Sequence, residues 1–90
     1  MPRVTLYSKP QCHLCDVVKD VIARVRTRRE FDLEIRNILD DPADHQLYKN
    51  DIPVVLVDGV EIARHRLSEQ RLEWALSGGM ANDQAPMTNK

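Results

Sequence analysis

The most regular pattern of apolar positions in the chain lies between residues 12 and 29. Apolar side chains recur there at the three- and four-residue spacing that lines one face of a helix, at Leu14, Val17, Val18, Val21, Ile22 and Val25. The pattern therefore predicts an amphipathic helix. Most of these side chains are β-branched and have low helix propensity, so we expect packing rather than propensity to hold the helix.

Two further segments have the composition of strands. Residues 3–7 are rich in β-forming side chains and stop at Ser8-Lys9-Pro10, which is a turn signal. Residues 31–36 alternate between apolar and polar side chains with a strict period of two. This alternation predicts a strand with one face toward the core and the other toward solvent.

A hairpin is predicted in the second half of the chain. Residues 53–57 are continuously apolar, which predicts a strand buried on both faces. Asp58-Gly59 is a turn signal, and residues 60–64 follow as the partner strand. Before the hairpin, a proline fits the first turn of a short helix over residues 42–49.

The last predicted helix has signals at both ends. Ser68 is a suitable N-cap, and Leu67 before it can pack onto Leu72 at the fourth helical position. A Gly-Gly pair ends the helix. Residues 80–90 have no periodicity, and we expect them to form a flexible tail after a single domain over residues 1–79.

The predicted order of elements is β-α-β-α-β-β-α, which defines an α/β fold. A strand–helix–strand start implies a right-handed crossover and parallel pairing of the first two strands. The hairpin adds antiparallel strands. The sequence therefore predicts a mixed four-stranded sheet with helices on both faces.

The composition is ordinary for a small globular domain and excludes several other classes. Of 90 residues, 42% are hydrophobic and 30% charged, and the net charge of −1 gives no overall attraction to nucleic acid or anionic membranes. The longest apolar run, of about five residues, is far short of the roughly 20 that span a bilayer. Two cysteines cannot form a multi-disulfide secreted scaffold, and the first residues lack the apolar region of a signal peptide, so we expect a cytoplasmic protein. We also expect it to be a monomer. We interpret the basic run over residues 24–29 as a solvated helix end.

Cys12-His13-Leu14-Cys15 follows the first predicted strand and opens the first predicted helix. Cys12 lies at the helix N-terminus, where free backbone N–H groups and the helix dipole stabilise an anion and lower the pKa of a cysteine thiol. Cys15 lies one turn further along, within reach of Cys12 and more shielded. One exposed attacking thiol and one resolving thiol are what reversible disulfide exchange requires.

Two alternatives remain open for this pair. Two cysteines at this spacing form half of a zinc site, which His13, His45 or His65 would have to complete. The cysteines can also be two core side chains without redox function. Their position after a strand and before an amphipathic helix favours redox chemistry.

Residues 7–15, Tyr-Ser-Lys-Pro-Gln-Cys-His-Leu-Cys, resemble the active-site entry of the glutaredoxin/thioredoxin superfamily and, more narrowly, of small glutaredoxin-like proteins. Ile52-Pro53 resembles the cis-proline dipeptide of the family, and residues 57–59 resemble the hairpin that follows it. The resemblance covers residues 3 to about 77 and implies a thioredoxin-like fold. It further implies that Pro53 is cis and packed beside the cysteines, and that the backbone of Ile52 pairs with an extended substrate.

The resemblance also implies roles for residues around the cysteines. Cys12 would be the catalytic nucleophile and Cys15 the resolving thiol, and the two would form a redox-active disulfide. Lys9 would contact glutathione or the thiolate, or else be a solvated loop lysine. His13, if protonated, would favour the thiolate, or else be a surface imidazole. The candidate substrate-binding residues are therefore Lys9, His13, Ile52 and Pro53.

The chain departs from the glutaredoxin pattern after the fourth predicted strand. Glutaredoxins commonly carry a Gly-Gly pair and an acidic residue there, which help hold glutathione. In this chain Ile62 is followed by Ala-Arg-His-Arg at residues 63–66. We therefore expect weak glutathione binding. Residues 64–66 lie where the partner-facing loop of the family would be, and they are a candidate contact for an acidic partner.

Taken as a whole, the pattern predicts a thiol–disulfide oxidoreductase that acts on a protein disulfide and needs no metal or organic cofactor. Reducing equivalents would come from glutathione or from a thioredoxin reductase. The alternative is a binding module that holds an iron–sulfur cluster between two protomers through Cys12 and glutathione.

Overall fold

The computed structural model describes residues 1–79, and residues 80–90, where the sequence predicts a flexible tail, lie outside the described residues. Along the chain the elements are β1 (Arg3–Ser8), α1 (His13–Arg26), β2 (Asp32–Asn37), a short 3-10 helix η1 (Ile38–Asp40), α2 (Pro42–Tyr48), β3 (Val54–Val57), β4 (Val60–Arg64) and α3 (Glu69–Leu76). The predicted order of strands and helices is confirmed. The structure adds η1, and α1 ends at Arg26 rather than at residue 29.

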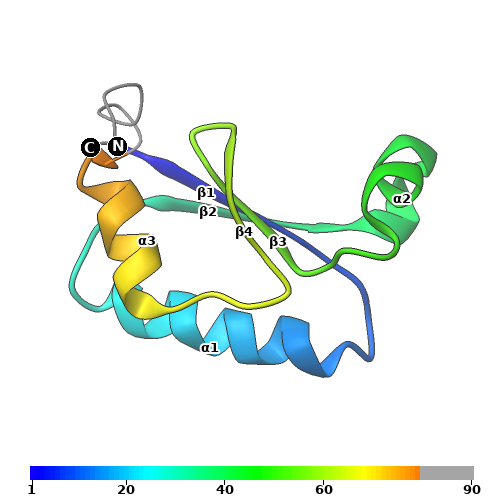
Figure 1. Ribbon diagram of the computed structural model, residues 1–90, viewed down its shortest axis with the longest axis horizontal. Helices are drawn as coiled ribbons and strands as arrows, with labels where there is room; N and C mark the ends of the chain where they lie inside the picture. Colours follow the sequence, from blue (N-terminus) through cyan, green and yellow to red (C-terminus); the bar gives the residue numbers. More distant parts are fainter. Residues whose placement is uncertain (80–90) are drawn as a thin grey trace, which may run out of the picture.

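The four strands form one mixed sheet, as predicted, and the structure shows their order to be β2-β1-β3-β4. β1 and β2 are parallel, whereas β3 is antiparallel to both β1 and β4. Figure 1 shows α1 and α3 together along one face of the sheet, while α2 lies beyond one end of it. Side-chain alternation places α2 on the other face, because Leu6 joins the core under α1 whereas its neighbour Tyr7 stacks on Tyr48 of α2. Within residues 1–79, no helix has the length and apolar character to cross a membrane.

The main core lies between the sheet and the two helices α1 and α3. Its buried side chains come mainly from alternate strand positions and from one side of each helix: Val4, Leu6, Val55, Val57, Ile62, Val18, Val21, Ile22, Val25, Leu72 and Ala75. Full burial of one large aliphatic side chain stabilises a fold by about 1.5–3 kcal/mol. This burial offsets the low helix propensity of the valines in α1.

Two residues of the predicted helical stripe lie outside the core. Leu14 is 42% exposed and Val17 is 45% exposed. At helical spacing, the side of α1 that carries them continues through Val21 to Arg24, and Arg24 contacts Glu69 of α3. Val21 is buried, so α3 covers this side only along the second half of α1. The first two turns, next to the cysteines, keep an apolar surface open to solvent.

The alternation predicted for residues 31–36 holds only in part: Phe31 is buried and Leu33 packs against the core, but the apolar side is not covered along its whole length. Ile35 is 49% exposed and Leu33 is only partly buried. β2 is an edge strand with a neighbour on one side only, so its apolar side chains receive less cover than those of β1 and β3. On the opposite face, Arg36 of β2 donates hydrogen bonds to Asp44 of α2 and to Glu34.

A network of exposed ion pairs ties the end of α1 to α3. Glu69 pairs with Arg24 at 2.8 Å and with Arg28 at 2.7 Å. Glu73 pairs with Arg28 at 2.6 Å and with Arg29 at 3.3 Å. These three arginines stay exposed, in agreement with the interpretation of a solvated helix end, but they also pair with α3, which the sequence alone did not predict. Their hydrogen bonds lower the pKa of both carboxyls, with Arg24 acting most strongly on Glu69 and Arg28 on Glu73.

Replacing Arg28, which contacts both carboxylates, is expected to flatten the acid side of the stability profile. A carboxyl with a lowered pKa in the folded protein stabilises the fold above its unfolded-state pKa, near 4.5, and this stabilisation is lost as the pH falls through the folded value. Arg28→Met should therefore be less stable than the wild type at neutral pH. Between roughly pH 5 and pH 3, however, its melting temperature should fall less than that of the wild type.

Thermal unfolding across this pH range tests the prediction. Arg26→Met is the matched control, because Arg26 lies two residues before Arg28 and forms no ion pair within residues 1–79. An Arg28→Met profile as steep as that of the wild type would contradict the role of the network.

Candidate active site

The cysteine pair lies where β1 leads into α1. Cys12 and Cys15 are joined by a disulfide, with their Cα atoms 5.2 Å apart. Cys12 is the N-cap of α1 and has extended backbone, while Gln11 before it adopts a positive φ of 59° as the chain turns into the helix. Cys12 is partly exposed, whereas Cys15 is fully buried. The two sulfur atoms therefore differ in accessibility, as their spacing on the helix predicts.

One backbone N–H group points at the sulfur atom of Cys12. The N–H of Cys15 donates a hydrogen bond to Cys12 Sγ at 3.2 Å. After reduction of the disulfide, the same N–H group and the positive end of the α1 dipole would face a thiolate at Cys12. This arrangement favours the ionised, nucleophilic form of Cys12 over the thiol.

The disulfide belongs to a second, smaller cluster at one end of the sheet. Its members are buried or half-buried: Cys12, Cys15, Ile38, Ile52, Tyr7 and Tyr48. The ring centroids of the two tyrosines are 4.4 Å apart. Burial raises the pKa of the Tyr7 phenol, and the nearby Asp44 carboxylate raises it further, so the ring stays neutral at physiological pH. Sequence reasoning missed this aromatic pair; the only signal was that Tyr7 ends a strand beside the cysteine loop.

The Ile52–Pro53 peptide bond is cis, as the resemblance implies. Pro53 is fully buried and Ile52 is 9% exposed. β3 begins only at Val54, so Ile52 lies outside the sheet while packing in the same cluster as the disulfide. Within residues 1–79, neither the N–H nor the C=O of Ile52 takes part in a backbone hydrogen bond. These two groups therefore have no backbone partner in the part of the chain that the structure describes.

The loop between β4 and α3 is tied to the cis-proline. His65, which has a positive φ of 68°, donates its backbone N–H to the C=O of Pro53 at 2.7 Å. The N–H of Arg66 donates to the C=O of Arg64 at 2.7 Å. The N–H groups of His65 and Arg66 are thus used within the protein, while the side chains of these two residues are exposed.

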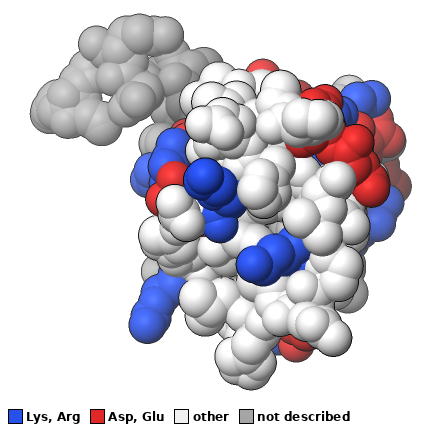
Figure 2. Space-filling model, turned by 90° about the vertical axis from the view of Figure 1, so that its right-hand side faces the viewer, with Lys and Arg blue, Asp and Glu red and all other residues white. Residues whose placement is uncertain are grey.

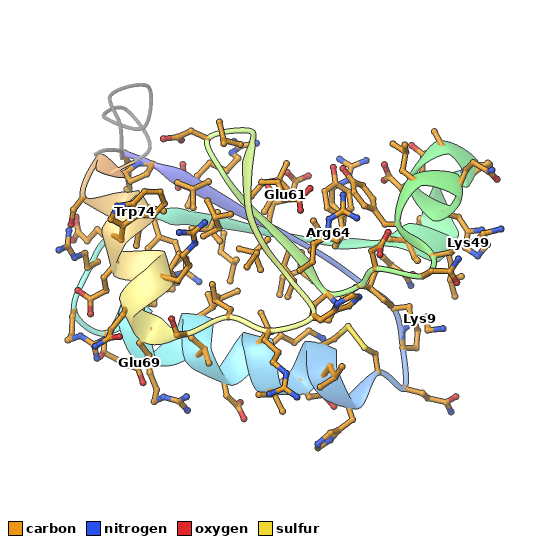
Figure 3. All side chains as sticks on the ribbon, viewed as in Figure 1. Lys9, Lys49, Glu61, Arg64, Glu69 and Trp74 are labelled. Carbon is orange, nitrogen blue, oxygen red and sulfur yellow. A yellow bond between two sulfur atoms is a disulfide. The ribbon has the colours of Figure 1, made fainter. Side chains whose placement is uncertain are left out.

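Ion pairs hold the same loop from its β4 side. Arg64 pairs with Asp51 at 2.9 Å, which places its guanidinium against the segment that precedes Pro53. Arg64 also pairs with Glu61 of β4, and Figure 3 shows these two side chains close together. The hydrogen bond from Arg64 lowers the pKa of the Glu61 carboxyl. The charge of Arg64 is therefore largely compensated within the protein.

The two other predicted site residues flank Cys12 along the chain. Lys9 and His13 are exposed, and Figure 3 shows Lys9 on the turn that leads into α1. Neither forms an ion pair within residues 1–79. In this part of the chain, no three His, Cys, Asp or Glu side chains are grouped as a metal site requires. His13, His45 and His65 therefore do not complete a zinc site with the cysteines.

A thioredoxin-like sheet with a Cys-x-x-Cys disulfide at the N-terminus of its first helix defines a redoxin. A family model described as a glutaredoxin-like domain (DUF836) matches residues 3–77 of the chain. The chain belongs to this family, and the predicted relationship to glutaredoxin-like proteins is confirmed.

Solved structures agree with this assignment. A protein of X. campestris is 30% identical, with a TM-score of 0.68 over 83% of this chain and 96% of that one. Protein Ne2328 from Nitrosomonas europaea is 21% identical, with a TM-score of 0.72 over 82% of this chain and 89% of the other. A mutant thioredoxin from Halobacterium salinarum, at 13% identity, has a TM-score of 0.62 over 87% of this chain and 73% of the other. The last two likenesses show the fold alone.

In the reduced protein, iodoacetamide is expected to alkylate Cys12 long before Cys15. Because a backbone N–H group and the helix dipole favour the Cys12 thiolate, its alkylation should reach half of the maximal rate below about pH 7.5, against about pH 8.5 for a free cysteine. Cys15 is fully buried and should react about tenfold more slowly or worse. Mass spectrometry of samples quenched at successive times and pH values identifies the modified residue. Equal rates at the two cysteines would contradict the assignment.

Proposed function

We propose that the protein is a thiol–disulfide oxidoreductase that reduces disulfides of other proteins through Cys12 and Cys15. One observation carries this proposal: the accessible sulfur of Cys12 accepts an N–H hydrogen bond at the start of α1, and a buried second cysteine lies within bonding distance. Such a pair supplies both an attacking and a resolving thiol.

The reaction is a pair of thiol–disulfide exchanges. The Cys12 thiolate attacks one sulfur of the substrate disulfide, forms a mixed disulfide and releases the other substrate sulfur as a thiolate, which takes up a proton. Cys15 then loses its proton and attacks Cys12 Sγ, so that the second substrate sulfur leaves in its turn. Two electrons pass to the substrate, and the Cys12–Cys15 disulfide remains for an external reductant to reduce.

The backbone of Ile52 gives the substrate its position. Its N–H and C=O have no backbone partner within residues 1–79 and lie in the cluster that contains the disulfide. An extended substrate segment that pairs with these two groups would add main-chain hydrogen bonds, as in other complexes formed by strand addition. Pairing here would hold the substrate sulfur beside Cys12.

The two cysteines should give different phenotypes when replaced. Cys12→Ser should lose essentially all disulfide-reducing activity, because the attacking thiolate is gone. Cys15→Ser should still attack but should accumulate the mixed disulfide, because no second thiol releases it. Non-reducing electrophoresis and mass spectrometry after incubation with a disulfide-containing substrate measure this complex. Equal trapping by both variants would overturn the assigned roles.

The purified wild-type protein can also be tested for the alternative function, the binding of an iron–sulfur cluster. Cluster binding requires Cys12 as a free thiolate, whereas Cys12 Sγ is bonded to Cys15 in this structure. Exchange therefore has the more direct support. Visible absorbance and stoichiometric iron in protein purified without oxygen would favour the cluster carrier instead.

Glutathione is expected to be a poor reductant for this protein. The loop after β4 lacks the glycines and the acidic residue of glutaredoxins, and its N–H groups at His65 and Arg66 already have partners within the protein. Loss of one charge-assisted contact commonly costs about 1.5–3 kcal/mol, or roughly 10- to 150-fold in affinity. We therefore propose that a dithiol donor or a flavoprotein reductase supplies the electrons.

A disulfide-reduction assay run with each donor in turn tests this expectation. Turnover with glutathione should be about tenfold or more below that with a dithiol donor. A glutathione titration followed by NMR should leave the resonances of residues 63–66 unchanged. Efficient turnover with glutathione together with shifts at these residues would show that the loop binds it after all.

A further inference from the structure

We propose that Arg64 is a positioning residue that holds the backbone of Ile52 in place for an extended polypeptide substrate, and that small disulfides do not depend on it. This inference rests on the proposed function and names the substrate class of the same site: disulfides carried by a polypeptide chain. Arg64 is the last residue of β4, and the sequence placed it among the candidate contacts for an acidic partner.

The residues on both sides of Ile52 are held from the side of β4. Before Ile52, a carboxylate oxygen of Asp51 lies 2.9 Å from Nη1 of Arg64. After it, the C=O of Pro53 accepts the backbone N–H of His65 at 2.7 Å. Ile52 itself has no backbone hydrogen bond within residues 1–79. The two contacts therefore fix the chain on either side of the residue whose backbone is unpaired.

The contact before Ile52 depends on a side chain. The backbone N–H of Asp51 donates to the C=O of Tyr48 at 2.9 Å, and this bond ties the segment to the end of α2. The link from Asp51 to β4 is its ion pair with Arg64. The imidazole of His65 lies further from the same carboxylate, at 3.9 Å. Loss of the Arg64 side chain would therefore free the segment on the side of β4.

The guanidinium of Arg64 is itself oriented by a second carboxylate. Its Nε and Nη2 atoms donate to the two oxygens of Glu61, which leaves Nη1 for Asp51. Figure 3 shows Arg64 and Glu61 close together. A planar guanidinium can hold two carboxylates on different edges in this way. The backbone of Arg64 lies opposite Val54, the first residue of β3, so the cation is anchored next to the strand that the segment enters.

The position of the segment matters for a substrate that pairs with main-chain groups. An extended polypeptide would use the N–H and C=O of Ile52, so its apparent affinity falls with the fraction of molecules in which these groups are in place. A small disulfide has no peptide backbone and needs only the sulfur of Cys12, which lies on a different segment. Figure 2 shows that the end of the molecule with α2 has a largely uncharged surface. We therefore expect the site to distinguish substrates by their backbone rather than by their charge.

Two uncharged substrates test the proposal: hydroxyethyl disulfide, and a disulfide-linked pair of short peptides with neutral side chains and blocked ends. Reduced protein, freed of reductant, is mixed with excess substrate, and its oxidation is followed by alkylation and mass spectrometry of quenched samples. The dependence of the rate on peptide concentration gives a half-saturating concentration and a maximal rate. The small disulfide gives a second-order rate constant.

Arg64→Met should raise the half-saturating concentration of the peptide by about threefold, within the range for one well-oriented exposed ion pair. The maximal rate and the rate with hydroxyethyl disulfide should stay within about 1.5-fold of the wild type, because the cysteines are unchanged. Asp51→Asn, which changes the net charge in the opposite direction, should give the same result. The double variant should add little to either single change, because both remove the same contact.

Lys49→Met is the matched control. It removes one positive charge two residues before Asp51, and Lys49 forms no ion pair within residues 1–79. Its half-saturating concentration for the peptide should equal that of the wild type. The rate with hydroxyethyl disulfide shows in each variant that the protein is folded and that Cys12 is reactive.

The outcomes separate the two proposals. An unchanged half-saturating concentration in Arg64→Met, an equal rise in Lys49→Met, or opposite effects of Arg64→Met and Asp51→Asn would overturn the positioning role and leave disulfide reduction intact. An equal loss of rate with both substrates would show a merely structural role and would also overturn it. If the wild type reduces neither substrate, the proposed function itself fails, and this inference fails with it.

Discussion

The packing of α1 on the sheet is the constraint on which the rest of the molecule depends. Its buried residues meet β1 and β3, and this contact fixes where the first turn of the helix begins relative to the end of β1. Cys12 is the N-cap of that turn. The position of its sulfur atom is therefore set by the packing of apolar side chains that take no part in the chemistry. A helix held mainly by buried valines would lose this register if its core side chains were shortened, because its own propensity is low.

Three loops from distant parts of the chain meet at this N-terminus, and each supplies a different kind of group. The β1–α1 turn carries the sulfur atoms, the segment before β3 carries open backbone groups at Ile52, and the β4–α3 loop supports that segment from the other side. None of the three would be positioned by its own hydrogen bonds alone. Their arrangement depends on the sheet, where β1 and β3 are neighbours although they are far apart in sequence.

Several features could be predicted because each depends on the spacing of residues that are close in the sequence. They are the order of elements, the mixed sheet, the helix caps and the cysteine motif. Ser68, for example, is the N-cap of α3, and its side chain accepts from Arg71 as a capping residue should. Contacts between distant elements could not be predicted in this way. The pairs of Arg28 with Glu69 and Glu73, the stacking of Tyr7 on Tyr48 and the exposure of Val17 depend on how far α3 and α2 extend over their neighbours.

The burial of Cys15 next to an accessible Cys12 has a consequence for oxidative damage. A peroxide that reaches this site meets the Cys12 sulfur first and converts it to a sulfenic acid, which further peroxide would carry to irreversible sulfinic and sulfonic acids. Cys15 is shielded from the oxidant but lies within bonding distance, so it can condense with the sulfenic acid and release water. The product is the same disulfide that ends a catalytic cycle, and a reductant returns it to use.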